Sequence, residues 1–157
     1  MVVPTIHIRQ AIRSDCKTIA EFNAALARET EHFELDMERL LRGVNGLFDE
    51  PSRGFYLLAE VNNKIAGQLM ITYEWSDWRN GVFWWIQSVY VKPEFRNQKI
   101  FTSLYKYIES SSKKEGNVCG LRLYVEKENE NAHTVYAKLN MKKTAYELLE
   151  VDFVLHR

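Results

Sequence analysis

The stretch from Trp84 to Tyr107, WWIQSVYVKPEFRNQKIFTSLYKY, constrains the fold of this chain more than any other. It begins as an apolar strand, passes through a Pro-Glu turn and a polar loop at residues 96–99, and continues as an amphipathic helix. A strand that leads through a loop onto a helix N-terminus builds an anion site, because the first helical N–H groups lack internal partners. Arg96 and Lys99 add positive charge there.

Hydrophobic patterns divide the rest of the chain into strands and helices. Asn62-Asn63 predicts a hairpin turn, and Asp36 predicts a helix cap. Gly67, inside a strand pattern, indicates a bulge or a close approach of another segment. Strands are expected at residues 5–10, 55–61, 64–74, 82–91 and 120–125, with one or two more in 143–156, and helices at 16–29, from 36 onward, at 97–114 and at 129–139. This order predicts one α/β domain over residues 1–157.

The charge balance of 21 basic against 21 acidic residues gives no global field that would favour nucleic acid or an anionic membrane as a partner. Cys16 and Cys119 form no Cys-x-x-Cys pattern, so we expect neither a disulfide framework nor a bound metal. The start MVVPTIHIRQ lacks the apolar core of a signal peptide, and no apolar run is long enough to span a bilayer. We therefore expect a soluble, cytoplasmic protein.

Two local patterns and the order of the elements resemble the GNAT superfamily of acyl-CoA-dependent N-acyltransferases. The first is the family's strand–loop–helix motif V-x-P-x-x-R-x-x-G-x-G/A, which matches VKPEFRNQKIF at residues 91–101. The second is its late-helix motif N-x-x-A-x-x-x-Y-x-x-x-G-F, which matches Asn129, Ala132, Tyr136, Asn140 and Met141. The resemblance implies a mixed, mostly antiparallel, twisted sheet of six to seven strands, with four flanking helices and splayed central strands.

The sequence departs from the first motif at two glycines, where it has Lys99 and Phe101. Glycine allows the backbone to approach a pyrophosphate closely. Two outcomes are therefore open: either Lys99 reaches the phosphates and compensates, or it weakens the site. Asn140 replaces a glycine of the second motif, and Asn tolerates the left-handed conformation needed at the end of a helix.

The resemblance implies that acetyl-CoA is the acyl donor and that a substrate amine attacks its thioester directly. The backbone of residues 88–91 would bind the pantetheine arm, and the Val89 N–H would polarise the thioester carbonyl, a contribution of roughly 3 kcal/mol. Tyr136 would protonate the departing thiolate, the alternative being a core tyrosine with a backbone partner. The residues implied in binding acetyl-CoA are Val89, Tyr90, Val91, Arg96, Asn97, Gln98, Lys99, Ile100, Phe101, Thr102, Asn129 and Tyr136.

The general base is left open by the sequence. Diamine acetyltransferases, which the chain partly resembles, carry a Glu on the central strand where this chain has Gln87, and a neutral amide cannot accept the proton. Glu74 and Asp77 are replacements by position only, and each has the alternative of being an ordinary exposed carboxylate. A water relay is equally admissible.

The acceptor pocket would be formed by residues 29–35 and 75–85. Trp75 and Trp78 beside Glu74 and Asp77 would suit a cationic or aromatic acceptor, with Gln87 orienting it. The alternative, favoured for Trp84 and Trp85, is that tryptophans of a central strand fill the core on either side of the sheet.

The leading hypothesis is an acetyl-CoA-dependent N-acetyltransferase for a primary amine of a small molecule. The alternatives are a non-catalytic or degenerate acyl-CoA-binding module, indicated by Lys99 and Gln87, and a peptide or protein N-terminal acetyltransferase. The aromatic surplus and the habit of the family make a homodimer plausible.

Overall fold

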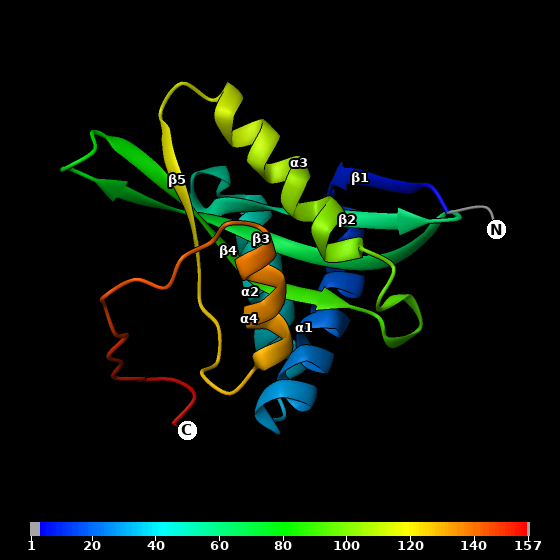
Figure 1. Cartoon of the computed structure of the whole chain (residues 1–157). Coiled ribbons are helices and arrows are strands. Elements are labelled where there is room, and N and C mark those ends of the chain that lie inside the picture. The colour runs from blue at the N-terminus through cyan, green and yellow to red at the C-terminus, as the bar shows by residue number, and fades with distance from the viewer. Residues whose placement is uncertain (1–3, 157) are drawn as a thin grey trace. The chain divides into compact units, whose positions relative to one another are not determined.

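The computed structural model describes residues 4–156, and the chain divides after Tyr124 into two compact units. Each unit is described by itself, and Figure 1 shows the elements of both. No helix within residues 4–156 is long and apolar enough to cross a membrane.

A five-stranded mixed sheet forms the centre of the first unit (Figure 1). Its strands are β1 (Ile6–Gln10), β2 (Gly54–Val61), β3 (Lys64–Ser76), β4 (Gly81–Val91) and β5 (Val118–Leu123), and they lie side by side in that order. Neighbours are antiparallel from β1 to β4, whereas β5 runs parallel to β4. Asn62 and Asn63 have φ of 49° and 60°, which confirms the predicted turn.

Three helices of the first unit cover the two faces of this sheet, with α1 (Cys16–Glu31) and α2 (Met37–Asp49) on one face and α3 (Ile100–Lys114) on the other (Figure 1). Asp36 caps α2 as predicted, because its Oδ1 accepts from the Arg39 N–H at 2.6 Å. Apolar faces of α1 and α2 pack on the sheet in one cluster. Its buried members are Ala11, Cys16, Ile19, Ala20, Val44, Leu47, Tyr56 and Leu58.

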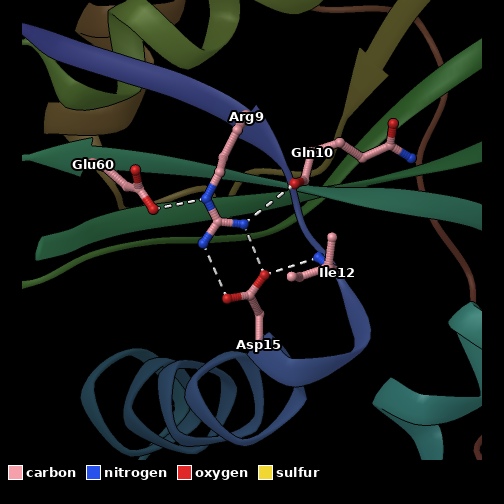
Figure 2. A network of polar contacts seen from close by, with 5 residues as sticks. All are labelled: Arg9, Gln10, Ile12, Asp15 and Glu60. Atoms are coloured by element: carbon pink, nitrogen blue, oxygen red, sulfur yellow. Dashed lines mark hydrogen bonds and ion pairs between the residues drawn. The ribbon is translucent and has the colours of Figure 1, made fainter. Parts of the chain in front are cut away.

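A polar network fastens α1 to the edge of the sheet (Figure 2). Arg9 donates to both carboxylate oxygens of Asp15, at 2.8 and 3.0 Å, and its Nε donates to Glu60 at 2.7 Å. Asp15 also accepts from the Ile12 N–H at 2.8 Å, so its side chain serves this network and does not cap α1. Asp15 is only 8% exposed, and the bond from the Arg9 guanidinium holds its pKa below the usual range.

The second unit contains helix α4 (Glu130–Lys138) followed by a chain with no strand among residues 139–156. The described sheet therefore has five strands, and the expectation of six to seven is wrong. Apolar residues near the C-terminus suggested a strand, but Leu149 and Phe153 are 90% and 84% exposed. Asp152 Oδ1 accepts from the N–H groups of Val154 and Leu155, at 2.7 and 2.8 Å, and this local turn takes donors that a strand ladder would need.

Candidate active site

Strand β4 carries a bulge in its second half. Gln68 pairs with Tyr90 and Met70 pairs with Gln87, so Leu69 of β3 faces two residues, Ser88 and Val89. Ser88 has φ 52°, a left-handed conformation that non-glycine residues rarely adopt. The bulge lies within the stretch that the sequence assigned to the pantetheine arm.

Beyond the bulge, β4 has an open edge. Its pairing with β5 runs from Val82 opposite Val118 to Ile86 opposite Leu123 and ends there. Residues 87–91 of β4 pair with β3 on one side and with no described strand on the other. This open edge lies at the place where the family resemblance implied splayed central strands.

The loop after β4 delivers the chain onto α3. A single 3-10 turn at Pro93–Phe95 follows the strand, and Asn97 and Lys99 both have φ 62°. Because of these left-handed residues, the helix begins at Ile100 and not at residue 97, the start that the sequence predicted. Ser103 donates its N–H to the Lys99 carbonyl at 2.9 Å, which is the first helical hydrogen bond of α3.

Gly67 allows α3 to begin close to the sheet. A Cβ at this position would lie 2.9 Å from the Tyr90 carbonyl oxygen and 3.0 Å from Ile100 Cγ2. Next to it, the Lys92 N–H donates to the Ala66 carbonyl at 2.9 Å. The predicted close approach at Gly67 is therefore the contact between β3, β4 and the first residue of α3.

Arg96 is turned back toward α1. Its Nη2 bonds to Glu29 at the end of α1, its Nε donates to the Val91 carbonyl at 3.0 Å, and its guanidinium lies 5.7 Å from the centre of the Tyr90 ring. Glu29 also accepts from the Tyr90 hydroxyl at 2.9 Å. The bond from Arg96 lowers the pKa of Glu29, which keeps that carboxylate ionised.

The face of β3–β5 on the side of α1 carries two further polar pairs. Gln87 donates its amide N–H to the Thr72 hydroxyl, and Glu74 is bound by Arg122. Arg122 also stacks on Phe83, at 3.7 Å from its ring centre. Beside these pairs, Trp85 and Tyr124 lie with their rings 4.4 Å apart. Glu74 and Gln87, both proposed from the sequence for the acceptor pocket, thus share one face of the sheet.

Trp84 points to the other face of the sheet. It is 7% exposed and packs edge-on against Phe55 at 5.3 Å, as expected for a tryptophan that fills the core. Trp84, Phe55, Tyr73 and Tyr107 line a cavity of about 550 Å³ beside the second half of α3, away from the loop at its start.

The loop between β3 and β4 contributes little to either face. Trp75 and Trp78 are 61% and 85% exposed. Asp77 Oδ1 accepts from the Trp78 N–H at 2.8 Å, which is a turn contact. Among the described contacts, none therefore joins these three proposed acceptor residues to Gln87.

In the second unit, α4 carries the predicted late-helix residues. Asn129 caps the helix, because its Oδ1 accepts from the Ala132 N–H at 3.0 Å. Asn140 adopts φ 61°, which confirms that it takes the left-handed position of the family's glycine. Burial raises the pKa of Tyr136, so its hydroxyl stays protonated at neutral pH.

Two residues near the bulge were missed by sequence reasoning. Gln68 is fully buried in β3 and donates to the Ser88 carbonyl at 3.1 Å and to Asn23 Oδ1 of α1 at 2.7 Å. A single amide within the apolar run IAGQLMI was the available signal, since buried polar side chains need partners. Asn23 gave no such signal, because it lies on an ordinary amphipathic helix.

Comparison with known proteins agrees with this architecture. The family model described as the acetyltransferase (GNAT) family matches residues 13–141. The crystal structure of a possible acetyltransferase from Clostridium difficile 630 is 49% identical, with a TM-score of 0.87 over 95% of this chain and 98% of that one. Among curated proteins, none matches the sequence.

Two more distant structures share the fold. A predicted acetyltransferase with acetyl-CoA from Clostridium acetobutylicum is 21% identical, with a TM-score of 0.76 over 97% of this chain and 99% of that one. Glucosamine-6-phosphate N-acetyltransferase from Arabidopsis thaliana is 20% identical, with a TM-score of 0.71 over 94% of this chain and 98% of that one.

An open strand edge, a bulge and a loop that runs onto a helix N-terminus define an acyltransferase of the N-acetylating class. Because the family model matches most of the chain, the chain belongs to the acetyltransferase (GNAT) family. The family predicted from the two sequence motifs is therefore confirmed.

Proposed function

We propose that this protein transfers an acetyl group from acetyl-CoA to a primary amine of a small molecule by direct attack. The observation that carries the proposal is the open edge of β4 at residues 87–91, next to the bulge and followed directly by the loop onto α3. This edge offers backbone groups to an extended amide-containing chain such as pantetheine, in the manner of a missing strand.

The residues around the open edge fit acetyl-CoA. The start of α3, where the helix dipole favours an anion, and the exposed Lys99 suit a pyrophosphate, and the left-handed Asn97 and Lys99 give the loop the shape that glycine would allow. Arg96 is the exception, because Glu29 already binds its guanidinium. Phosphate contacts would therefore come from the helix start and Lys99, with Arg96 joining only when it leaves Glu29.

The chemistry that acetyl-CoA supplies is an activated thioester carbonyl. The Val89 N–H would donate a hydrogen bond to the carbonyl oxygen as negative charge develops there. Tyr136 would donate its proton to the departing sulfur, and its raised pKa keeps that proton available. Neither carboxylate considered from the sequence is proposed as the base, because Glu74 is paired with Arg122 and Asp77 lies in an exposed loop, where it accepts from the Trp78 N–H. A water relay is the route that we propose for the proton of the amine.

The surroundings of Gln87 give no support for a diamine as the acceptor. A second ammonium group would need a carboxylate partner, and Glu29 of α1 and Glu74 of β3 are engaged by Arg96 and Arg122. The exposed Tyr124 and the half-buried Trp85 offer an aromatic surface beside Gln87.

The test combines binding and turnover in the wild-type protein and in Tyr136→Phe. Calorimetry should show micromolar binding of acetyl-CoA, with desulfo-CoA as the unreactive control, and a screen of primary amines should release free thiol. In Tyr136→Phe we expect kcat to fall about 100-fold while the acetyl-CoA Kd stays within a factor of two, because general acid catalysis contributes about 10²–10⁴-fold. Unchanged turnover would remove Tyr136 from the mechanism.

A second candidate is an acyl-CoA-binding module without catalysis. It is favoured by Gln87, whose amide is held by Thr72 where an amine-acetylating relative would have a carboxylate. Tight binding of acetyl-CoA without thiol release for any amine would support this alternative.

A further inference from the structure

The side chain of Gln68 joins helix α1 to the bulge of β4. Its Nε2 donates to Asn23 Oδ1 of α1 at 2.7 Å and to the Ser88 carbonyl at 3.1 Å. Gln68 is 0% exposed and lies on β3, directly opposite Tyr90. One buried amide therefore connects helix α1 to the bulge of the central strand.

The backbone at Ser88 needs such an anchor. Its φ of 52° is unfavourable for a residue with a Cβ, and conformations of this kind persist where the surroundings determine them. The hydrogen bond from Gln68 fixes the direction of the Ser88 carbonyl, which is one end of the Ser88–Val89 peptide unit.

The direction of that carbonyl determines the direction of the Val89 N–H. In a trans peptide unit, the C=O and N–H groups point in opposite directions. The Ser88 carbonyl points to the side-chain amide of Gln68, which also reaches Asn23 of α1, so the Val89 N–H points away from that amide. On the side of β5, no described strand pairs with residues 87–91, so the edge of β4 beside Val89 is open.

Packing alone does not account for an amide at position 68. Gln68 Oε1 is buried and has no hydrogen-bond partner among the described residues. An unsatisfied buried carbonyl destabilises a fold, whereas an apolar side chain of the same shape would leave nothing unpaired. The amide nitrogen, in contrast, donates to Asn23 Oδ1 and to the Ser88 carbonyl of the bulge, so these two bonds account for the amide.

We propose that Gln68 is a positioning residue for acyl transfer, which holds the Ser88 bulge so that the Val89 N–H is directed at the thioester carbonyl. The proposal rests on the proposed function, in which Val89 is the donor to that oxygen. Gln68 acts through the backbone and touches neither substrate.

The first test is Gln68→Met, which keeps the length of the side chain and removes its donor. We expect kcat to fall about 10- to 100-fold, because loss of one oxyanion donor costs about 10²–10³-fold and the N–H is here misdirected and not deleted. The acetyl-CoA Kd should change less than about threefold, because the phosphate loop is untouched. Asn45→Leu is the matched control: its amide donates to the Leu41 carbonyl at 2.9 Å on α2, and kcat should not change.

The second test, Gln68→Glu, decides the question even where Gln68→Met folds poorly. A carboxyl group can donate to the Ser88 carbonyl only when protonated, and burial favours that form. The ratio of variant kcat to wild-type kcat should therefore rise several-fold between about pH 8 and about pH 6. Unfolding curves at each pH show where the variant stays folded, and over that range a role in packing alone would leave this ratio independent of pH.

Three outcomes would overturn the proposal. Full kcat in Gln68→Met would show that the bulge needs no amide. A pH-independent ratio in Gln68→Glu would show that donation to Ser88 is irrelevant. Absence of thiol release by the wild-type protein with every amine would instead refute the proposed function, and the role of Gln68 would fall with it.

Discussion

Lys99 occupies a backbone conformation that the family pattern gives to glycine. Its φ of 62° and ψ of 22° place it in the left-handed region, at the residue whose carbonyl accepts the first helical hydrogen bond of α3. A side chain there costs about 1 kcal/mol relative to glycine. The sequence could identify the substitution, but only the structure shows that the loop keeps the glycine-like shape and leaves Lys99 exposed beside the helix N-terminus.

Replacing Lys99 by glycine separates the two roles that the sequence left open. We expect Lys99→Gly to weaken acetyl-CoA binding about three- to tenfold and to reduce its salt dependence, since one cation near the phosphates is lost. Calorimetry at two ionic strengths measures both effects. Lys106→Gln, which removes an exposed charge farther along α3, is the control and should leave the Kd unchanged. Tighter binding in Lys99→Gly would mean that the side chain obstructs the site.

At the scale of elements, the start of α3 and the middle of β3 depend on each other through Gly67. The neighbours of an added Cβ include the Tyr90 carbonyl, which is backbone and cannot move aside cheaply. The glycine pattern indicated a close approach, yet the partner segment is some thirty residues away in the chain and could not be named from the sequence.

Gly67→Ala should lower the free energy of unfolding by about 1–3 kcal/mol, the usual cost of overpacking, and shift α3 relative to the sheet. Urea denaturation followed by circular dichroism measures the stability. The control is Gly43→Ala in α2, where no atom lies within 4 Å of the added Cβ. That variant should gain about 0.5–1 kcal/mol, because alanine favours a helix interior. Equal effects in the two variants would contradict the close approach at Gly67.

The order of strands and helices in the first unit could be predicted from the spacing of hydrophobic residues and from the turn residues. Errors arose where local polar contacts override the pattern: Asn97 and Lys99 delay α3, and Asp152 turns the chain where a strand was expected. The bulge at Ser88 was beyond prediction, because a single extra residue in an apolar strand changes no periodic signal over a short window. The Arg96–Glu29 pair was also hidden, since it joins distant segments.

For the first unit as a whole, the network of Arg9, Asp15 and Glu60 links the edge of the sheet to the start of α1 (Figure 2). The Asp15 carboxylate has a lowered pKa in the folded state. A group with a depressed folded pKa contributes stability above its unfolded pKa of about 3.9, and that contribution is lost as the pH falls through the folded value.

Asp15→Asn should therefore reduce the free energy of unfolding at neutral pH by about 2 kcal/mol, the scale of hydrogen bonds to a charged group. The difference between wild type and variant should shrink as the pH falls below about 4. Denaturation curves from pH 7 down to pH 3 check this, in the range where both proteins remain folded. Asp49→Asn, which breaks the exposed pair with Arg13, should cost less than about 1 kcal/mol at any pH. A constant difference for Asp15→Asn across the range would rule out the role of its charge.

The bulge in β4 has a consequence for how this strand tolerates changes in length. Gln87 and Tyr90 are three positions apart, yet Gln87 bonds to Thr72 and Tyr90 bonds to Glu29, both on the side of α1. In a chain one residue shorter, without Ser88, Val89 would stand opposite Leu69 and the ladder from Gly67 to Ser76 would be regular. Every remaining side chain of β4 would keep its present side of the sheet. The deletion would therefore leave the pairing of β3 and β4 intact and remove only the peptide unit that Gln68 holds.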